Sequence, residues 1–187
     1  MTRSPLVLQR EQAVAVFVDV QERLHPEVVR RDEVASNLVK LAQAVRILGV
    51  PAVVTEHAAK AFGPTIAPLR EALERMEPLH KIVFSCFGSG EFGKALESLG
   101  RRQLLLAGLE THICVCQTAL DAIARGYQVH VVRDASSARS EENHRVGLDK
   151  MALAGVIPAS TETALFELLE RAGTDEFRRI LPLVKSS

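Results

Sequence analysis

One stretch of the chain restricts the fold more than any other: the unbroken apolar run 104–107, which ends at Gly108. Side chains in a strand alternate between the two faces of a sheet, so a continuous apolar run needs cover on both faces. Apolar residues then recur at helical spacing from Ile113 to Ala124, with Thr111 as the expected N-cap. The stretch therefore predicts a buried parallel strand that leads directly into a helix.

The same order of strand and then helix recurs along the chain. Strands are expected at residues 13–19, 51–55, 80–85, 104–107, 127–132 and 155–158. Helices are expected at 32–48, 66–76, 89–99 and 111–125, in a segment ending near 154, and at 161–172 and 174–184, with loops at 56–64 and 134–142. This alternation predicts an α/β fold: a three-layer, doubly wound, six-stranded parallel sheet with helices on both faces. No repeat or long linker divides the 187 residues, so we expect one domain over residues 1–187.

The composition argues against several classes of function. Lys and Arg together number 23, as do Asp and Glu, so the net charge favours neither a nucleic acid nor an anionic membrane as a partner. No apolar run approaches the ~20 residues that a membrane-spanning helix needs. The first residues lack the apolar core of a signal peptide, and the three cysteines form no disulfide framework. We expect a cytoplasmic location and no nucleic-acid or membrane partner.

Cofactor motifs are not found in the sequence. The first strand runs into Asp19 without a Gly-x-Gly-x-x-Gly or Gly-Lys-Ser/Thr pattern, and the glycine-rich segment 87–93 lacks the dinucleotide spacing. Glu56 and His57 follow the second strand and leave a metal site open as an alternative, but no His-x-His, Asp-x-His or His-Glu-x-x-His pattern accompanies them. We therefore expect neither a cofactor nor a metal.

Three polar residues stand where an α/β sheet places its ligand crevice. Asp19 ends the first strand, Lys81 lies in the third, and Cys114 sits in the first turn of the helix after the fourth. A helix N-terminus and a nearby lysine both favour thiolate over thiol, and a carboxylate can take the thiol proton. Each residue also has an ordinary structural interpretation: a buried core cysteine, a solvated lysine and a capping aspartate. Their convergence on one crevice favours a nucleophilic site.

Several separated motifs resemble the isochorismatase-like cysteine hydrolase superfamily, which also contains the nicotinamidases. They are similar in particular to its isochorismatase domain-containing subgroup, and they cover nearly the whole chain. The motifs are Val18-Asp-Val-Gln21, Lys81-x-x-Phe-Ser85, Gly108-Leu-Glu-Thr-His-Ile-Cys-Val115, Gly126-Tyr-Gln-Val-His-Val-Val132, Asp134-Ala-Ser-Ser-Ala-Arg-Ser140 and Glu162-Thr-x-Leu-Phe-Glu-Leu-Leu169.

The resemblance implies a catalytic triad of Cys114, Lys81 and Asp19 that hydrolyses the C–N bond of a small amide through a thioester. It also implies a cis peptide bond between Leu109 and Glu110, which would turn the Glu110 N–H toward the site. That N–H and the N–H of Cys114 would then form an oxyanion hole. The residues suggested as pocket walls are Phe17, Gln21, Phe84 and Phe87.

Two departures from the family pattern bear on the reaction. Nicotinamidases hold a metal with Asp-x-His after the second strand, where this chain has Thr55-Glu-His57. The true isochorismatases replace the nucleophile with a small residue, whereas this chain has Cys114. We therefore expect a metal-independent cysteine hydrolase that forms a homo-oligomer, with the last helix as the element that reaches a neighbour. The alternatives are a nicotinamidase proper, a catalytically idle scaffold and a redox-sensing thiol.

Overall fold

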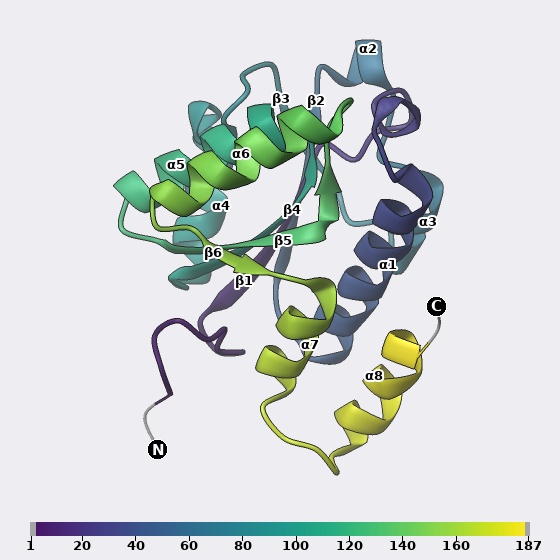
Figure 1. Cartoon of the computed structure of the whole chain (residues 1–187), viewed down its shortest axis with the longest axis vertical. Helices are drawn as coiled ribbons and strands as arrows, with labels where there is room; N and C mark the ends of the chain where they lie inside the picture. Colours follow the sequence, from purple (N-terminus) through teal and green to yellow (C-terminus); the bar gives the residue numbers. More distant parts are fainter. Residues whose placement is uncertain (1–2, 186–187) are drawn as a thin grey trace.

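A six-stranded parallel sheet in the order β3-β2-β1-β4-β5-β6 forms the centre of the computed structural model, which describes residues 3–185 (Figure 1). The strands are β1 (Ala13–Val18), β2 (Ala52–His57), β3 (Leu79–Lys81), β4 (Gln103–Leu109), β5 (Gln128–Ser137) and β6 (Ile157–Ala159). The strand order reverses direction between β1 and β4, which lie side by side at the middle of the sheet. This reversal is the position at which open α/β sheets bind their ligands.

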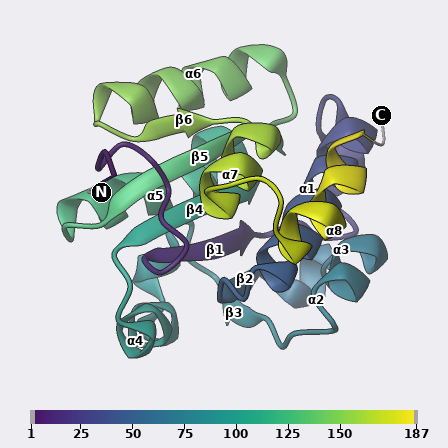
Figure 2. The same ribbon diagram turned by 90° about the horizontal axis from the view of Figure 1, so that it is seen from below.

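Helices cover both faces of the sheet (Figures 1 and 2). They are α1 (Arg31–Ile47), α2 (Ala59–Phe62), α3 (Ala67–Ala72), α4 (Gly90–Leu99), α5 (Cys116–Ala124), α6 (Glu141–Leu153), α7 (Thr161–Leu169) and α8 (Asp175–Lys185). Apolar residues of α1, α3, α7 and α8 form one core with the sheet, and those of α4, α5 and α6 form the other. The predicted three-layer α/β class is therefore confirmed.

The two central strands are buried on both faces, as the apolar run 104–107 predicts. Every residue of β1 and of β4 is buried. Leu104 and Leu106 belong to the core under α4, α5 and α6, whereas Leu105 and Ala107 belong to the core under α1 and α7. Burying such side chains supplies roughly 2 kcal/mol each, so these two strands anchor the rest of the sheet.

Several predicted boundaries are wrong. β2 continues through Glu56 and His57 because these residues pair with His80 and Lys81 of β3, and α2 forms within the expected 56–64 loop. β3 ends at Lys81 instead of Ser85. β5 extends to Ser137 because Ser136 and Ser137 pair with the end of β4 beyond a register shift, so the first part of the expected 134–142 loop is strand. Local polarity suggested loops where sheet pairing decided otherwise.

The last helix packs on its own subunit. Ile180 of α8 is fully buried in the core that α1 and α7 share with the sheet. The prediction that this helix reaches a neighbouring subunit therefore has no support in its packing. Within residues 3–185, no helix is long and apolar enough to cross a membrane.

The buried His130 on β5 makes the stability depend on pH. Its side chain is 1% exposed, and within the described residues neither ring nitrogen has a hydrogen-bond partner. Burial lowers its pKa from 6.5 to about 4. Because the unfolded chain takes up this proton more readily, the stability tied to neutral His130 is complete above pH 6.5 and is lost as the pH falls toward 4.

We expect the free energy of unfolding to fall by up to about 3 kcal/mol over that interval through His130, at about 1.4 kcal/mol per pKa unit. His130→Leu should flatten this part of a urea-unfolding series measured at several pH values. An unchanged slope in His130→Leu would contradict the assignment.

Candidate active site

Asp19 lies at the carboxyl end of β1 in a backbone conformation that few side chains adopt. Its φ is 51°, and its N–H donates to the carbonyl oxygen of Thr55 at 3.1 Å. Aspartate tolerates this left-handed region better than most residues. Its carboxylate is fully buried and faces Lys81 of β3, which lies two strands away in the sheet. A strained, buried carboxylate at the switch point of the sheet is a typical functional position.

Lys81 and Asp19 form a buried ion pair. Lys81 Nζ donates to Asp19 Oδ2 at 2.5 Å, and it also donates to the carbonyl oxygens of Val83 at 3.1 Å and Phe84 at 3.2 Å. The second carboxylate oxygen, Oδ1, accepts from Thr55 Oγ1 at 2.7 Å. All three ammonium protons therefore have acceptors, and both carboxylate oxygens are bound. Such complete pairing is what makes a buried charge tolerable.

Cys114 lies on a π-helical turn, Thr111–Val115, between β4 and α5. The Val115 N–H donates to the Glu110 carbonyl at 3.3 Å across this turn. Thr111 is not the N-cap that the sequence suggests: the cap position is Glu110, and Thr111 Oγ1 bonds to His144 Nδ1 of α6 at 2.9 Å. π-turns inside helices often mark functional sites. Here the turn sets the direction of the Cys114 side chain.

The electrostatics keep Cys114 as a thiol at rest. Burial raises the pKa of Cys114 strongly, the Asp19 carboxylate raises it further, and Lys81 lowers it by less. Of the charges that act on the Cys114 thiol, the Asp19 carboxylate therefore has the largest effect on its pKa. Burial alone lowers the pKa of Lys81, but Asp19 and then Cys114 outweigh it, so the net shift is upward. Lys81 therefore lowers the pKa of the thiol, as expected, but by less than burial and Asp19 raise it. The thiol needs a base to react.

The expected cis peptide bond is not present. Residues 3–185 contain no cis peptide bond, so the Leu109–Glu110 bond is trans. Leu109 pairs with Ser137 as the last residue of β4, which continues extended backbone up to Glu110. The trans form is also favoured by ~3 kcal/mol for a non-proline bond. The Glu110 side chain is fixed instead by Arg139, whose backbone N–H and Nε donate to Oε2 at 2.9 and 3.2 Å.

A cavity of about 350 Å³ opens beside Cys114. Its wall combines apolar side chains with a few polar ones: Arg23, Leu24, Glu27, His57, Phe62, Phe84, Leu109, Glu110, Ile113, Cys114 and Arg139. Within the wall, the ring of His57 stacks with Phe62 and with Phe84 at centroid distances of 5.8 and 5.6 Å. A mostly apolar pocket with a nucleophile and few polar groups suits a small molecule.

Of the four residues predicted to line the pocket, one lies at the cavity and three do not. Phe84 lines the cavity, as expected. Phe17 is 1% exposed and belongs to the core under α1, and Phe87 packs edge-on against Phe92 in the opposite core, so neither reaches the cavity. Gln21 has a structural role: it bonds the backbone of His57 in both directions, at 2.8 and 3.0 Å, and the carbonyl of Gly63 at 2.7 Å. It thereby holds the segment that carries two of the wall residues.

Sequence reasoning missed most of this wall. His57 lies on β2, Phe62 on the unexpected helix α2, and Arg139 follows the strand that runs further than predicted. The signal for His57 in the sequence is its place at the carboxyl end of a parallel strand, and that place alone suggests only a metal site. Leu24 and Ile113 resemble ordinary apolar residues in the sequence, and only the tertiary structure brings them to Cys114.

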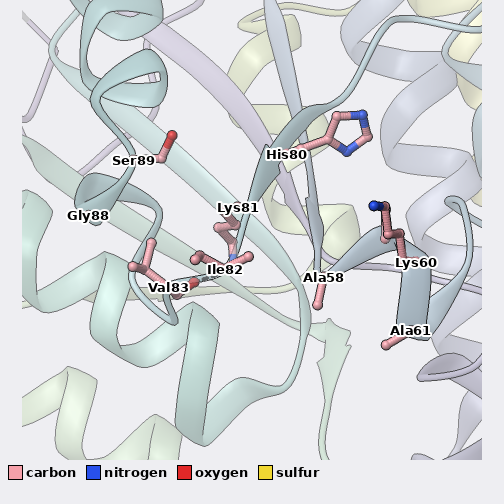
Figure 3. Close-up of a pocket in the computed structure, with 10 residues that line it drawn as sticks. Ala58, Lys60, Ala61, His80, Lys81, Ile82, Val83, Gly88 and Ser89 are labelled. Carbon is pink, nitrogen blue, oxygen red and sulfur yellow. Dashed lines mark hydrogen bonds between the residues drawn. The ribbon is translucent and has the colours of Figure 1, made fainter.

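A second and larger cavity, of about 790 Å³, lies on the other side of the loop after β3. Figure 3 shows it between Ala58, Lys60 and Ala61 on one side and the loop that carries Ile82 and Val83 on the other. Lys81 contributes to its wall, but Cys114 does not. Because Cys114 lines the smaller of these two cavities and not the larger one, the smaller cavity is the candidate active site.

Glu56 and His57, the two residues of the metal alternative, make separate contacts. Glu56 Oε1 accepts from the N–H and the hydroxyl of Thr65, and Oε2 lies 3.6 Å from His80 Nδ1. His57 instead faces the cavity. Within residues 3–185, no group of three His, Cys, Asp or Glu side chains is arranged to hold a metal ion.

The sequence and the fold are similar to those of known proteins. A family model described as the isochorismatase domain matches residues 13–163, so the chain belongs to the isochorismatase-domain family. Isochorismatase domain-containing protein 2 of Danio rerio is 34% identical over 95% of this chain and 89% of its own length. Isochorismatase domain-containing protein 1 of Salmo salar is 35% identical over 94% of this chain, which spans only 62% of that relative.

Solved structures share the whole architecture. The MAR1 ribonuclease of Caenorhabditis elegans has a TM-score of 0.90 at 29% identity, over 97% of this chain and 93% of that one. YcaC from Pseudomonas aeruginosa, with hexane-2,5-diol and covalent acrylamide, has a TM-score of 0.90 at 26% identity, over the same shares. The YcaC gene product of Escherichia coli, described as an octameric hydrolase of unknown specificity, has a TM-score of 0.87 at 25% identity, over 98% and 89%. Family and fold together support a hydrolase.

Proposed function

We propose that this chain is a cysteine hydrolase that cleaves the C–N bond of a small amide. The observation that carries the proposal is the fully buried ion pair of Asp19 and Lys81, whose two charges act on Cys114 where that residue lines a cavity. A thiol close to a paired carboxylate and lysine provides a nucleophile, a base and a charge that holds the base in place.

In the proposed reaction, Asp19 accepts the Cys114 proton while the sulfur attacks the amide carbonyl carbon. The N–H of Cys114 stabilises the negative charge that forms on the carbonyl oxygen. The C–N bond breaks, and protonated Asp19 returns its proton to the departing ammonia or amine. Asp19 then takes a proton from water, whose oxygen attacks the thioester carbon. The C–S bond breaks, the acid is released, and Asp19 passes its proton to the departing sulfur, which restores the thiol and the carboxylate. Lys81 keeps its charge throughout and holds Asp19 Oδ2.

The cavity restricts the substrate to a small molecule. At about 350 Å³ and with walls such as Phe84 and Ile113, it fits an amide with a compact apolar body. The P. aeruginosa YcaC structure contains covalent acrylamide, itself a small amide. By analogy with the octameric E. coli relative we also propose a homo-oligomer. A cytoplasmic location stays a prediction, as does the absence of a nucleic-acid partner.

The test is release of ammonia from a panel of small primary amides, including acrylamide, propionamide, benzamide and nicotinamide. We expect turnover of at least one amide by the wild type and none by Cys114→Ala, with the two proteins giving the same circular dichroism and unfolding midpoint. Preference for nicotinamide alone would favour a nicotinamidase proper. No turnover in the whole panel would favour the idle scaffold, and reversible oxidation of Cys114 without hydrolysis would favour a redox sensor.

The ribonuclease description of the C. elegans relative defines a further control. A single-stranded RNA should be left intact by the purified chain, because the chain has no net positive charge to attract a phosphate backbone. RNA cleavage that is lost in Cys114→Ala would replace the amide proposal.

A further inference from the structure

Two buried side chains that the proposed reaction does not use lead to Asp19. Thr55 of β2 is 1% exposed, and its Oγ1 lies 2.7 Å from Asp19 Oδ1. Cys86, in the 3-10 turn after β3, is fully buried, and its Sγ lies 3.8 Å from the same Thr55 oxygen. The three side chains form a continuous path from Cys86 through Thr55 to the carboxylate.

The direction of the hydrogen bonds along this path is determined by chemistry. An ionised carboxylate only accepts, so the Thr55 hydroxyl must donate its single proton to Asp19. Thr55 Oγ1 is then free to accept, and the Cys86 thiol is the donor. Burial, and next the charge of Asp19, raise the pKa of Cys86 to about 11, so this thiol keeps its proton at neutral pH.

Hydrogen bonds of the backbone fix both ends of this path. The Cys86 N–H donates to Thr118 Oγ1 at 2.9 Å, and the fully buried Thr118 belongs to α5, the helix that follows the π-turn of Cys114. At the other end, the Thr55 carbonyl accepts the N–H of Asp19 at 3.1 Å. Thr55 thus contacts Asp19 through both its backbone and its side chain.

We propose that Thr55, oriented by Cys86, is a positioning residue for the base Asp19. This inference rests on the proposed function. Lys81 binds Oδ2 alone and leaves the carboxylate free to turn about its last side-chain bond, a broad torsion. The Thr55 hydroxyl binds Oδ1 and fixes that torsion, so that the carboxylate stays directed at Cys114.

The test compares Thr55→Val, which keeps the shape and loses the hydroxyl, with Thr55→Ser, which keeps the hydroxyl. We expect Thr55→Val to lower kcat/KM for an accepted amide by about 10- to 100-fold, mostly in kcat, because a hydrogen bond to a charged group is lost. KM should change little, because the contact acts on the base and not on the substrate. Thr55→Ser should stay within about threefold of the wild type.

A second readout does not need turnover. Without the Thr55 dipole, the Asp19 charge acts more strongly on the sulfur, so Cys114 in Thr55→Val should react more slowly with iodoacetamide at pH 8 than in Thr55→Ser. If no amide is turned over but this difference holds, the positioning contact stands and the proposed hydrolase fails. The proposal is overturned if Thr55→Val keeps the wild-type kcat and alkylation rate, or if Thr55→Ser is as impaired as Thr55→Val.

The part assigned to Cys86 is tested by a double-mutant cycle. We expect Cys86→Ala to lower kcat/KM by about threefold in the wild type and to have no further effect in Thr55→Val, because Cys86 acts through Thr55. Cys86→Ser, which keeps a donor, should match the wild type. An equal effect of Cys86→Ala in both backgrounds would remove Cys86 from the path.

Discussion

Asp19→Asn is expected to remove amide hydrolysis while making Cys114 more reactive toward a simple alkylating agent. The loss of the base should lower kcat/KM by about a thousandfold, within the range for general bases. The gain has a different origin: after burial, the Asp19 carboxylate is the group that raises the pKa of Cys114 most, and Lys81 lowers it. An amide at position 19 leaves the Lys81 charge unopposed, so iodoacetamide should react about tenfold faster at pH 8 if the pKa falls by one unit.

Lys81→Met is the matched control, with the opposite expected effect on the alkylation of Cys114. It should slow alkylation of Cys114, because the one charge that lowers the pKa of the thiol is removed. Cys86 and Cys116 are 0% and 2% exposed, against 6% for Cys114, which faces the cavity, so peptide mapping should find the label on Cys114. Slower alkylation in Asp19→Asn, or more than a tenth of wild-type turnover, would contradict the role of Asp19.

The fold of Asp19→Asn needs its own control, because Lys81 loses its partner in a buried position. Removing one member of a buried pair costs about 3–5 kcal/mol. Asp19→Asn/Lys81→Met removes both charges and should recover most of that stability in urea unfolding. It should nevertheless stay inactive. Activity in the double variant would show that neither residue takes part in the reaction.

The second large effect is expected from Gly108→Ala. Gly108 has a φ of 127°, and a Cβ placed there would lie 2.1 Å from the carbonyl oxygen and 2.7 Å from the nitrogen of Val18. These are backbone atoms of the adjacent central strand and have no room to move. We expect a loss of about 4 kcal/mol or more in the free energy of unfolding, or no folded protein at all.

Gly126→Ala provides the control for backbone strain. Gly126 also has a positive φ, of 77°, but a Cβ there would meet nothing within 4 Å. It should cost only about 1 kcal/mol, the ordinary penalty of the left-handed region. Equal losses in the two variants, measured by urea unfolding, would mean that strain alone explains Gly108, and that the close approach of β4 to β1 does not.

The sequence predicted the fold well because its main signals are local and redundant. The apolar run 104–107 requires cover on both faces, and the alternation of strands and helices then permits few topologies. β1 and β4 are neighbours in that topology, so Asp19 and Cys114 were expected at the same edge, and the structure places them there. The boundary errors, at β2, β3 and β5, occur where sheet pairing overrides local polarity.

The cavity wall was much less predictable. Phe17 and Phe84 are similar in the sequence, yet one is buried in the core under α1 and the other lines the cavity. The difference depends on the face of the strand and on where each strand ends, which only the packed sheet decides.

The sequence by itself determined the layered α/β architecture, the family and the three residues of the proposed triad, because each depends on residue type and spacing. The tertiary structure alone decided two other features. The pKa of the Cys114 thiol is raised, and Asp19 is held from a second side by Thr55. Both depend on burial and on contacts between strands distant in sequence. Lys81 was expected to set the state of the thiol, but burial and Asp19 outweigh its charge.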